Sequence, residues 1–221
     1  MKILALSDVH GAYAKMVQIV AAHPAVDVII VAGDLTTYGS RREAEDAIHR
    51  LQSFGKPVFV VAGNMDPPEL DELFVALGVS LNARGVVYRD VGFFGVSAAP
   101  LSPLHTPNEI SETEIAARAE AGWRNILHAK EKVFVPHAPP FTTTLDVTRA
   151  GKHVGSAAVR TFIEKHQPDV TICGHIHEAR GTDTIGATRI LNCGPAADGC
   201  FGVISLNDSV TITIHPAPDL A

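Results

Sequence analysis

The chain has 221 residues, which is enough for one sizeable hydrophobic core but not for two separate domains of ordinary size. Apolar residues make up 46% of the chain and charged residues 19%, the balance of a soluble globular protein. The formal net charge of -6 argues against a protein that binds polymeric nucleic acid, because such proteins normally carry a basic face. A small phosphate substrate stays compatible with this charge, since a bound metal supplies positive charge locally.

The cysteines and the apolar segments indicate in which cellular compartment the protein is expected. Cys173, Cys193 and Cys200 are odd in number and lack C-x-x-C spacing, which fits neither a disulfide framework nor a zinc-thiolate site. Asp8 follows the N-terminal apolar segment too early for a secretory signal. No segment approaches the roughly 20 continuous apolar residues of a membrane span. We therefore expect a cytoplasmic protein with free, buried thiols and no membrane partner.

Five short apolar runs are predicted to form strands. They occupy residues 2–7, 26–32, 57–62, 132–136 and 168–173. Each run is continuously apolar or nearly so, whereas a strand with one face in water alternates apolar and polar residues. This pattern is typical of strands that are covered on both faces.

Helical patterns separate the first three of these runs. Residues 12–23 and 40–54 both show apolar residues at helical spacing, the second with Ser40 as the expected N-cap and Gly55 as the expected C-cap. Strands that alternate with helices of this size form βαβ units. The first part of the chain therefore predicts a mainly parallel sheet.

The middle of the chain shows two other patterns. Residues 84–99 predict two strands that meet at a tight turn near Arg89 and Asp90. Residues 107–130 predict a long amphipathic helix, in which Ser111 begins a capping box.

After residue 178 the sequence predicts antiparallel strands, with turns at Gly186 and at Asn207-Asp208. No linker or low-complexity segment interrupts the chain. We therefore expect one α/β domain over residues 1–221, with two layers of sheet in the core and helices outside.

A side chain able to bind a metal follows each of the five apolar runs within a few residues. These side chains belong to Asp8, His10, Asp34, Asn64, His137, His175 and His177. The carboxyl edge of a parallel sheet is where α/β proteins bind ligands, so we expect the seven residues to share one crevice. Gly33, Gly63 and Gly174 directly precede three of them, and a residue without Cβ lets neighbouring ligands approach closely.

Each of these residues also has an ordinary structural explanation when it is taken alone. Aspartate, asparagine and glycine are frequent in turns, and His137 alone would pass for a loop histidine. The G-H-x-H pattern at residues 174–177 is more specific, because the spacing aims both rings to one side of an extended segment. A metal-compatible residue at all five strand ends favours a metal centre over five unrelated turns.

The number and type of these residues indicate two cations. Seven ligands are too many for one tetrahedral zinc, but they suit two metals that share a bridging carboxylate. Oxygen and nitrogen ligands without thiolate favour Mn, Fe, Zn, Ni or Co. Two cations about 3.5–4 Å apart are a common means of clamping the attacking and leaving oxygens at phosphorus. The sequence therefore predicts a dinuclear site for metal-assisted phosphoester hydrolysis.

The same residues resemble the motifs of the calcineurin-like metallophosphoesterase superfamily, which are D-x-H, G-D, G-N, a lone H and G-H-x-H. The resemblance runs from Asp8 to His177. Residues 135–146, 153–181 and 192–195 additionally resemble the Icc-related predicted phosphoesterases, which are small single-domain members. This resemblance implies a four-layer α/β/β/α sandwich.

The resemblance also implies which metal each ligand serves. The first metal would be held by Asp8, His10 and His177, and the second by Asn64, His137 and His175. Asp34 would bridge the two cations. Of these residues, Asp34, Asn64 and His137 would also take part in catalysis.

Met65 departs from the family pattern. Many members carry a histidine at this position, which protonates the leaving oxygen or stabilises charge near it. A thioether cannot donate a proton, and general-acid help is typically worth about two to four powers of ten. Asp66, His105 and His153 are candidate substitutes and, with Met65, candidate substrate contacts; their positions in the sequence do not rank them.

The implied substrate is a small phosphoester. Met65 weakens monoester chemistry, which favours phosphodiesters such as cyclic nucleotides or nucleotide-like molecules. The residues after Asp34 lack the D-R-G continuation of protein Ser/Thr phosphatases, so activity on phosphoproteins is disfavoured. The alternative is a protein-interaction scaffold with an idle metal site, against which the presence of all seven ligands counts. The native metals and the oligomeric state, including a homo-oligomer, are left open.

Overall fold

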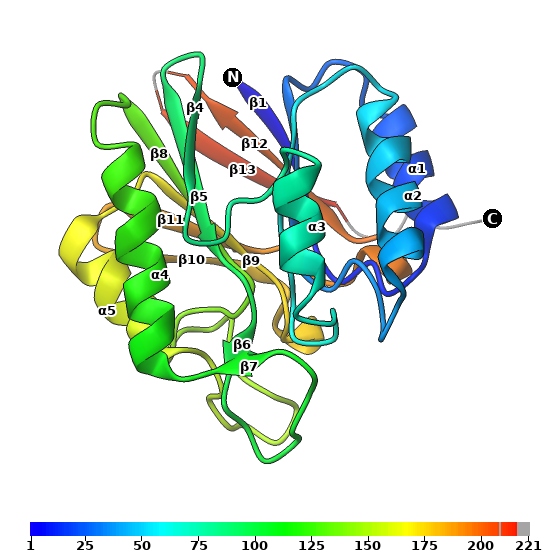
Figure 1. Ribbon diagram of the computed structural model, residues 1–221. Helices are drawn as coiled ribbons and strands as arrows, with labels where there is room; N and C mark the ends of the chain where they lie inside the picture. The colour runs from blue at the N-terminus through cyan, green and yellow to red at the C-terminus, as the bar shows by residue number, and fades with distance from the viewer. Residues whose placement is uncertain (208, 216–221) are drawn as a thin grey trace.

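The computed structural model describes residues 1–207 and 209–215, and it contains two large β-sheets packed face to face (Figure 1). The first sheet has the spatial order β13-β12-β1-β2-β3 and comprises β1 (Lys2–Leu6), β2 (Val28–Ala32), β3 (Val58–Val61), β12 (Phe201–Leu206) and β13 (Val210–His215). The second has the order β10-β11-β9-β8-β5-β4 and comprises β4 (Gly85–Tyr88), β5 (Val91–Val96), β8 (Glu131–Pro136), β9 (Val170–Cys173), β10 (Gly181–Ile185) and β11 (Thr188–Asn192). A short parallel pair consists of β6 (Ala99–Pro100) and β7 (Glu109–Ile110).

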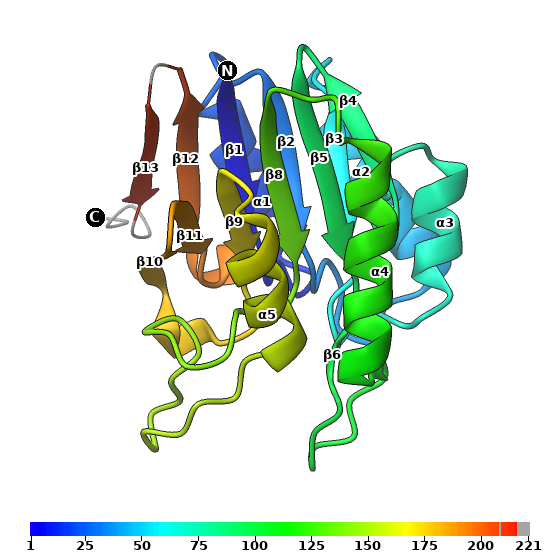
Figure 2. The same cartoon turned by 90° about the vertical axis from the view of Figure 1, so that its left-hand side faces the viewer.

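Helices cover the outer face of each sheet (Figure 2). On the first sheet lie α1 (Tyr13–Ala21), α2 (Arg41–Gln52) and α3 (Leu70–Ala76), and on the second lie α4 (Glu112–Asn125) and α5 (Ala157–His166). Two short 3-10 turns, η1 (His177–Ala179) and η2 (Ala196–Asp198), complete the described elements.

Three apolar clusters separate these layers. One cluster packs α1, α2 and α3 against the first sheet, the second fills the space between the two sheets, and the third packs α4 and α5 against the second sheet. Both sheets are therefore apolar on both faces, which explains the continuously apolar strands. The fold is the α/β/β/α sandwich that the sequence predicts.

The five predicted strands are divided between the two sheets. β1, β2 and β3 are parallel neighbours in the first sheet, and β8 and β9 are parallel neighbours in the second. Each group ends at the same edge of the sandwich, so the turns that follow all five strands lie close together. The prediction of antiparallel strands late in the chain holds for the pairs β10–β11 and β12–β13, whereas β11 also pairs in parallel with β9.

The long helix expected at residues 107–130 is shorter in the structure, as α4. It starts at Glu112 because the Ser111 side chain accepts a hydrogen bond from Glu114 N at 3.2 Å, while the residues before it pair as β7. The second half of the capping box is absent from the described contacts, since the Glu114 carboxylate pairs with Arg118 instead.

Helix α2 begins as predicted, with the Ser40 hydroxyl accepting from Glu43 N at 3.2 Å. It ends at the C-cap Ser53, so Gly55 lies two residues beyond the cap, with φ at +68°. No prediction covered helices α3 and α5; α3 has only 7 residues and leaves little periodic pattern, whereas α5, with 10 residues, is longer than the predicted α1, with 9.

Most of the predicted turns are confirmed. Arg89 and Asp90 have φ values of +48° and +68° and join β4 to β5, and Gly186 joins β10 to β11. The turn expected at Asn207-Asp208 includes Asp208, which lies outside the described residues.

Two further expectations concern the whole chain. The three cysteines are free and buried, as predicted. Over residues 1–207 and 209–215, no helix has both the length and the apolar character that crossing a membrane requires.

Candidate metal centre

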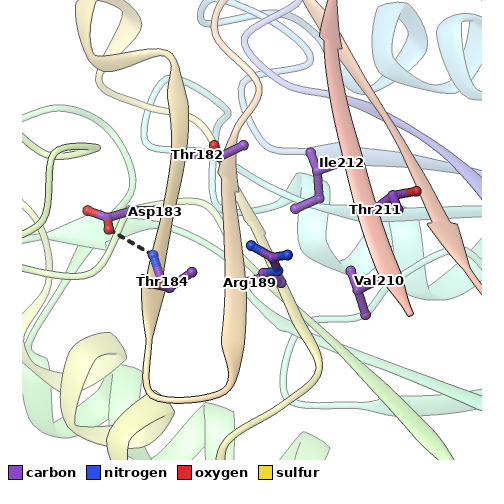
Figure 3. A pocket seen from close by; sticks show the side chains of 7 residues that line it. All are labelled: Thr182, Asp183, Thr184, Arg189, Val210, Thr211 and Ile212. Carbon is purple, nitrogen blue, oxygen red and sulfur yellow. Dashed lines mark hydrogen bonds between the residues drawn. The ribbon is translucent and has the colours of Figure 1, made fainter. Parts of the chain in front are cut away.

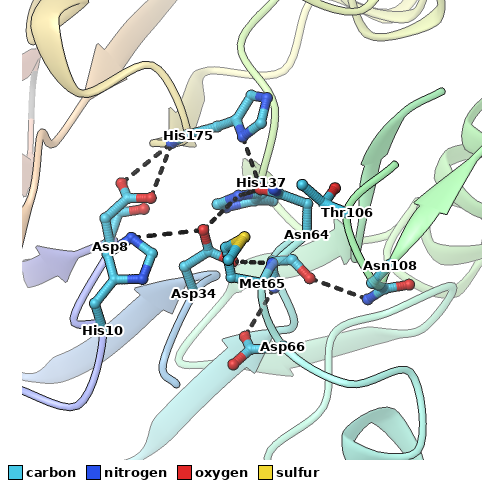
Figure 4. Close-up of polar contacts among 12 residues, drawn as sticks. Asp8, His10, Asp34, Asn64, Met65, Asp66, Thr106, Asn108, His137 and His175 are labelled. Carbon is cyan, nitrogen blue, oxygen red and sulfur yellow. Dashed lines mark hydrogen bonds and ion pairs between the residues drawn. The ribbon is translucent and has the colours of Figure 1, made fainter. Parts of the chain in front are cut away.

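The turns after the five parallel strands bring the seven predicted ligands together at one edge of the sandwich. Figure 4 shows all of them except His177 with labels. In chain order, Asp8 and His10 follow β1, Asp34 follows β2, Asn64 follows β3, His137 follows β8, and His175 and His177 follow β9. Their donor atoms are carboxylate and amide oxygens and imidazole nitrogens, with no thiolate. This donor set fits divalent transition metals.

Three of these residues form a first ligand group. Asp8, His10 and His177 each offer one ligand atom within 4.8 Å of the others. His177 Nε2 lies 3.3 Å from Asp8 Oδ1 and 3.3 Å from His10 Nε2. Asp8 is fully buried, whereas 43% of the His177 side chain is exposed, so the group opens towards solvent on the histidine side.

Three other residues form a second group around one amide oxygen. Asn64 Oδ1 lies 2.9 Å from His137 Nε2 and 2.8 Å from His175 Nδ1. Asn64 and His137 are both buried. The two rings therefore face the same oxygen from different strands.

Asp34 lies between the two groups. Its Oδ2 atom is 3.7 Å from His10 Nε2 and 3.5 Å from His137 Nε2. Its other oxygen accepts a hydrogen bond of 2.7 Å from Met65 N, which fixes the orientation of the carboxylate. One Asp34 oxygen is thus placed to contact a cation in either group.

Hydrogen bonds on the far side of two rings orient them towards the cluster. His137 Nδ1 lies 2.8 Å from the carbonyl oxygen of Ala32, and His10 Nδ1 lies 2.9 Å from Thr37 Oγ1. Support of this kind is usual for histidines that bind metals, because it leaves Nε2 free to act as the ligand. Thr37 was not predicted from the sequence, where its only signal is its place in the turn after Asp34.

The glycines before three ligands are needed for space. A Cβ atom would overlap a neighbouring side chain at each of them, with His137 at Gly33, with Asp34 at Gly63 and with Ser7 at Gly174. The prediction that these glycines allow a close approach is confirmed.

The backbone is strained at four of the ligands. Asp8, His10, Asp34 and His175 have φ values between +48° and +69°, a region that non-glycine residues seldom occupy. Backbone hydrogen bonds hold two of these conformations, from Asp8 N to the Gly33 carbonyl and from His10 N to the Asp34 carbonyl. Four of the twelve non-glycine residues with positive φ in the described chain are thus proposed ligands, and strained backbone of this kind is often found at functional sites.

Burial, hydrogen bonds and charges within the cluster shift the pKa values of four ligands, and the hydrogen bond to Asp8 is the main cause that raises the pKa of His177. Burial alone raises the pKa of Asp8, but the hydrogen bond from His177 and the positive charge of His137 outweigh it and lower this pKa to about 2. Burial alone lowers the pKa of His137, but the Asp34 carboxylate raises it to about 9. Burial, with the charge of His137, lowers the pKa of His175 to about 4.

Two of these shifts, those of Asp8 and His175, favour the form of the residue that binds a cation. At neutral pH Asp8 is ionised and His175 is neutral, the forms in which each binds a metal. His137 holds a proton beside two carboxylates, and a cation that binds there has to displace it.

Asp66 lies beneath the ligands and does not line the cavity, contrary to the role of substrate contact that we considered. It is fully buried and accepts hydrogen bonds from the amides of Leu35, Thr36 and Gly63 at 2.8–3.1 Å. Burial and the Asp34 charge raise the pKa of Asp66 to about 6. It connects the turn that carries Asp34 to the turn before Asn64.

A cavity of about 760 Å³ opens above the ligands. Met65 and His153 line this cavity, whereas His105 is exposed on a loop and is not part of the lining. His153 Nδ1 lies 2.7 Å from Asp146 Oδ1, and Asp146 is fully buried. The structure therefore distinguishes His153 from the other two candidate proton donors.

A second cavity, of about 500 Å³, lies between strands β10 and β11 and the edge strand β13 (Figure 3). Asp183 and Arg189 are its charged residues, and threonine and aliphatic side chains make up the rest of the lining. The described residues that line it include no group of candidate metal ligands.

Comparison with known proteins relates this site to a family. The sequence model described as calcineurin-like phosphoesterase matches residues 1–179. The protein MJ1162 of Methanocaldococcus jannaschii is 31% identical over 199 residues, which cover 88% of this chain and 88% of that protein. The Rhodopseudomonas palustris protein named "Probable cyclic nucleotide phosphodiesterase RPA0124" is 27% identical over 186 residues, covering 80% of this chain and 66% of that protein.

Two solved structures share the fold at low sequence identity. TT1561 of Thermus thermophilus matches with a TM-score of 0.76 and 20% identity, covering 98% of this chain and 99% of that one. A dimetal phosphatase from Danio rerio matches with a TM-score of 0.67 and 13% identity, covering 99% of this chain and 96% of that one. With the family match over residues 1–179, these findings show that the chain belongs to the calcineurin-like phosphoesterase family.

Proposed function

We propose that the protein hydrolyses small phosphodiesters, with a preference over phosphomonoesters, and that it uses two divalent metal ions. The observation that carries this proposal is the position of Asp34, one oxygen of which lies between two ligand groups at the base of a cavity. Membership of the family indicates a phosphoric ester hydrolase that uses divalent metals. The name of the Rhodopseudomonas palustris relative suggests cyclic nucleotides as one class of substrate to test.

The chain's own residues divide the work of holding the metals. Asp8, His10 and His177 would hold one ion, and Asn64, His137 and His175 would hold the other. Asp34 would be a ligand shared by the two. When bound, the pair of cations supplies an activated water and neutralises charge on the phosphate oxygens.

The preference for diesters rests on Met65. This side chain lines the cavity next to Asn64 and cannot donate a proton to a leaving oxygen. For a given leaving group, a phosphomonoester dianion reacts through a looser transition state than a diester, with more negative charge on the leaving oxygen, so it depends more on such a donor. We therefore expect diesters to be cleaved faster than monoesters of the same leaving group.

His153 is the residue we propose as a proton donor to the substrate. Asp146 holds its Nδ1 atom at 2.7 Å, which leaves Nε2 as the free nitrogen in a residue that lines the cavity. The Asp146 carboxylate orients the ring by accepting the proton on Nδ1; to act as an acid, His153 has to be in the imidazolium form, in which Nε2 also carries a proton that it can give to the leaving oxygen. Replacing His153 with Gln keeps a hydrogen-bond donor but removes the titratable group. It should slow the alkyl esters more than the nitrophenyl esters.

The proposal is tested with protein that has been stripped of metal and then loaded with Mn²⁺. We expect hydrolysis of bis(p-nitrophenyl) phosphate to exceed that of p-nitrophenyl phosphate, and chelation to abolish both activities. Asp34→Asn should lose both activity and one bound ion, while Asp46→Asn, an exposed aspartate on α2, serves as the matched control. Full metal occupancy without hydrolysis of either ester would contradict the proposal and favour the interaction scaffold.

A further inference from the structure

The walls of the cavity are two loops, the first wall loop (residues 99–109) and the second wall loop (residues 141–155). Each loop is held in its conformation by a carboxylate of its own. Glu109 accepts hydrogen bonds of 2.6–2.9 Å from the amides and hydroxyls of two residues of its own loop. Asp146 accepts from three amides of the second wall loop at 2.9–3.0 Å, and from His153. Both walls are therefore ordered structures and not loose segments.

The first wall loop is also fixed to the metal ligands. The Asn108 side chain donates to the Gly63 carbonyl at 3.0 Å, and Asn108 N donates to the Asn64 carbonyl at 3.1 Å (Figure 4). The loop thus keeps a set position relative to a residue of the second ligand group.

The walls expose large apolar side chains above the ligands. Leu101 and Leu104 of the first wall loop are 69% and 81% exposed, and Phe141 and Val154 of the second are 38% and 39% exposed. These four account for nearly half of the large apolar residues that are exposed in the described part of the chain, and all four line one cavity. An exposed apolar cluster of this kind marks a binding surface.

The charges of the cavity lining favour a substrate with few charges of its own. Among the described residues that line it, none is a lysine or an arginine, and the charged residues besides the metal ligands and His153 are Glu109 and Glu112. A negatively charged group of a substrate would therefore bind chiefly to the metal ions. A second charged group, placed away from the metals, would be desolvated beside carboxylates.

The N-terminus of α5 is also closed to anions. Helix N-termini near a cavity commonly bind phosphate through their free amides. Here the Glu112 carboxylate accepts from Ala157 N at 3.1 Å, from Ala158 N at 2.8 Å and from the Ser156 hydroxyl at 2.6 Å. The protein's own carboxylate occupies the position that a second phosphate would take.

We infer that the substrate is a singly charged phosphodiester whose second substituent is uncharged and apolar or aromatic, and that this substituent packs between the two wall loops against Leu104 and Phe141. The inference rests on the proposed function and narrows its substrate class. A cyclic nucleotide meets the charge condition, because it carries one negative charge; both of its ester oxygens belong to one ribose, and the flat uncharged base on that ribose is the group that would pack between the loops. Nucleoside diphosphates and triphosphates do not satisfy it.

The test uses Mn²⁺-loaded protein and three p-nitrophenyl phosphodiesters that share one leaving group. Their second substituents are methyl, n-hexyl and 5-carboxypentyl, the last two being matched in length and different in charge. We expect kcat/KM for the hexyl ester to exceed that of the methyl ester about tenfold or more, because each buried methylene adds to binding. The carboxypentyl ester should fall well below the hexyl ester. Equal values for the methyl and hexyl esters, or for the hexyl and carboxypentyl esters, would overturn the inference.

Substitutions in the wall loops test whether the second substituent of the ester binds there. Leu104→Ser and Phe141→Ser should bring the ratio of kcat/KM between the hexyl and methyl esters towards one. Leu127→Ser, which replaces an exposed leucine just beyond the end of α4, should keep the ratio of the unaltered protein. A ratio that is unchanged in Leu104→Ser and Phe141→Ser would contradict the inference. If both variants instead lose binding to phosphatidylcholine vesicles while the ratio holds, the loops contact a lipid surface and the inference is wrong.

A binding measurement separates this inference from the proposed function. If no ester is hydrolysed, the proposed function fails. Calorimetric titration of the loaded protein with methylphosphonate and hexylphosphonate then still tests whether the wall loops bind an apolar substituent. Tighter binding of hexylphosphonate, lost in Leu104→Ser, supports the apolar site. Equal affinity for the two phosphonates overturns it.

Discussion

The base and the walls of the main cavity are built in opposite ways. The base consists of the seven proposed metal ligands, which follow parallel strands and are held by backbone hydrogen bonds and by close packing of glycines. The walls are two loops with exposed apolar side chains, each held by one carboxylate of its own. The sheet topology thus fixes the atoms that would act on phosphorus, whereas the loops provide the surface that would select the rest of the substrate.

The largest effect is expected from a ligand of the base. Asp8→Asn removes one carboxylate oxygen from the first ligand group, and the amide cannot replace its charge. Since outer-shell changes already lower metal affinity or activity about 10–100-fold, this variant should lose at least about 100-fold in activity. Mass-spectrometric metal analysis should show one ion or none per chain. Two tightly bound ions in Asp8→Asn would contradict the assignment of this group.

The next effect concerns the space between ligands. Gly174→Ala places a methyl group where Ser7 and Asp8 already lie, and overpacking of this kind costs about 1–3 kcal/mol. Urea unfolding of the metal-free protein measures this loss. Gly181→Ala is the control, because its added methyl would meet the end of the Leu145 side chain at 3.3 Å and the Ala179 carbonyl oxygen at 3.9 Å. Equal losses in the two variants would show that the base is less tightly packed than we describe.

A smaller effect should come from backbone strain at the base. His10 has φ at +48°, so glycine at this position should give a more stable metal-free protein than alanine, by about 1 kcal/mol. Both variants lack the imidazole, and the comparison therefore isolates the backbone. Urea unfolding in the presence of chelator measures the difference. An alanine variant that is more stable than the glycine variant would show that the backbone at His10 is not strained.

The smallest effect should appear in a wall, as a dependence on pH. Partial burial alone raises the pKa of Glu109, but hydrogen bonds from Thr106 and Ser102 outweigh it and lower this pKa to about 2, against an ordinary value of 4.5. A carboxylate with a lowered pKa stabilises the folded loop above pH 4.5, and this contribution is lost as the pH falls through 2. The protection factors of the Ser102 and Thr106 amides, which compare each exchange rate with that of an unstructured peptide at the same pH, should fall over that window. In Glu109→Gln this fall should be absent, because the side chain no longer titrates.

The base was largely predictable from the sequence, because each ligand follows an apolar run and parallel strands end at one edge. His175 and His177 also carry a specific spacing. The division of the five strands between two sheets could not be predicted, since βαβ patterns do not show which strands become neighbours. Asp66 could not be placed either, because an aspartate beside a site has the same signal whether it faces the cavity or holds the turns beneath it.

The walls could not be predicted. Leu104 and Phe141 lie in loops without periodicity, and nothing in the sequence shows that the two loops face each other. The link between Glu112 and the start of α5 joins residues 44 to 46 positions apart and depends on how the two helices pack. Sequence patterns record local spacing, whereas these contacts arise from tertiary structure.

The central claim is that the base seats two cations on either side of Asp34. Anomalous diffraction from crystals of the Mn²⁺-loaded protein, recorded near the manganese edge, tests it most directly. The account predicts two peaks, one beside Asp8, His10 and His177 and the other beside Asn64, His137 and His175, with Asp34 in contact with both. A single peak, or peaks away from Asp34, would contradict it.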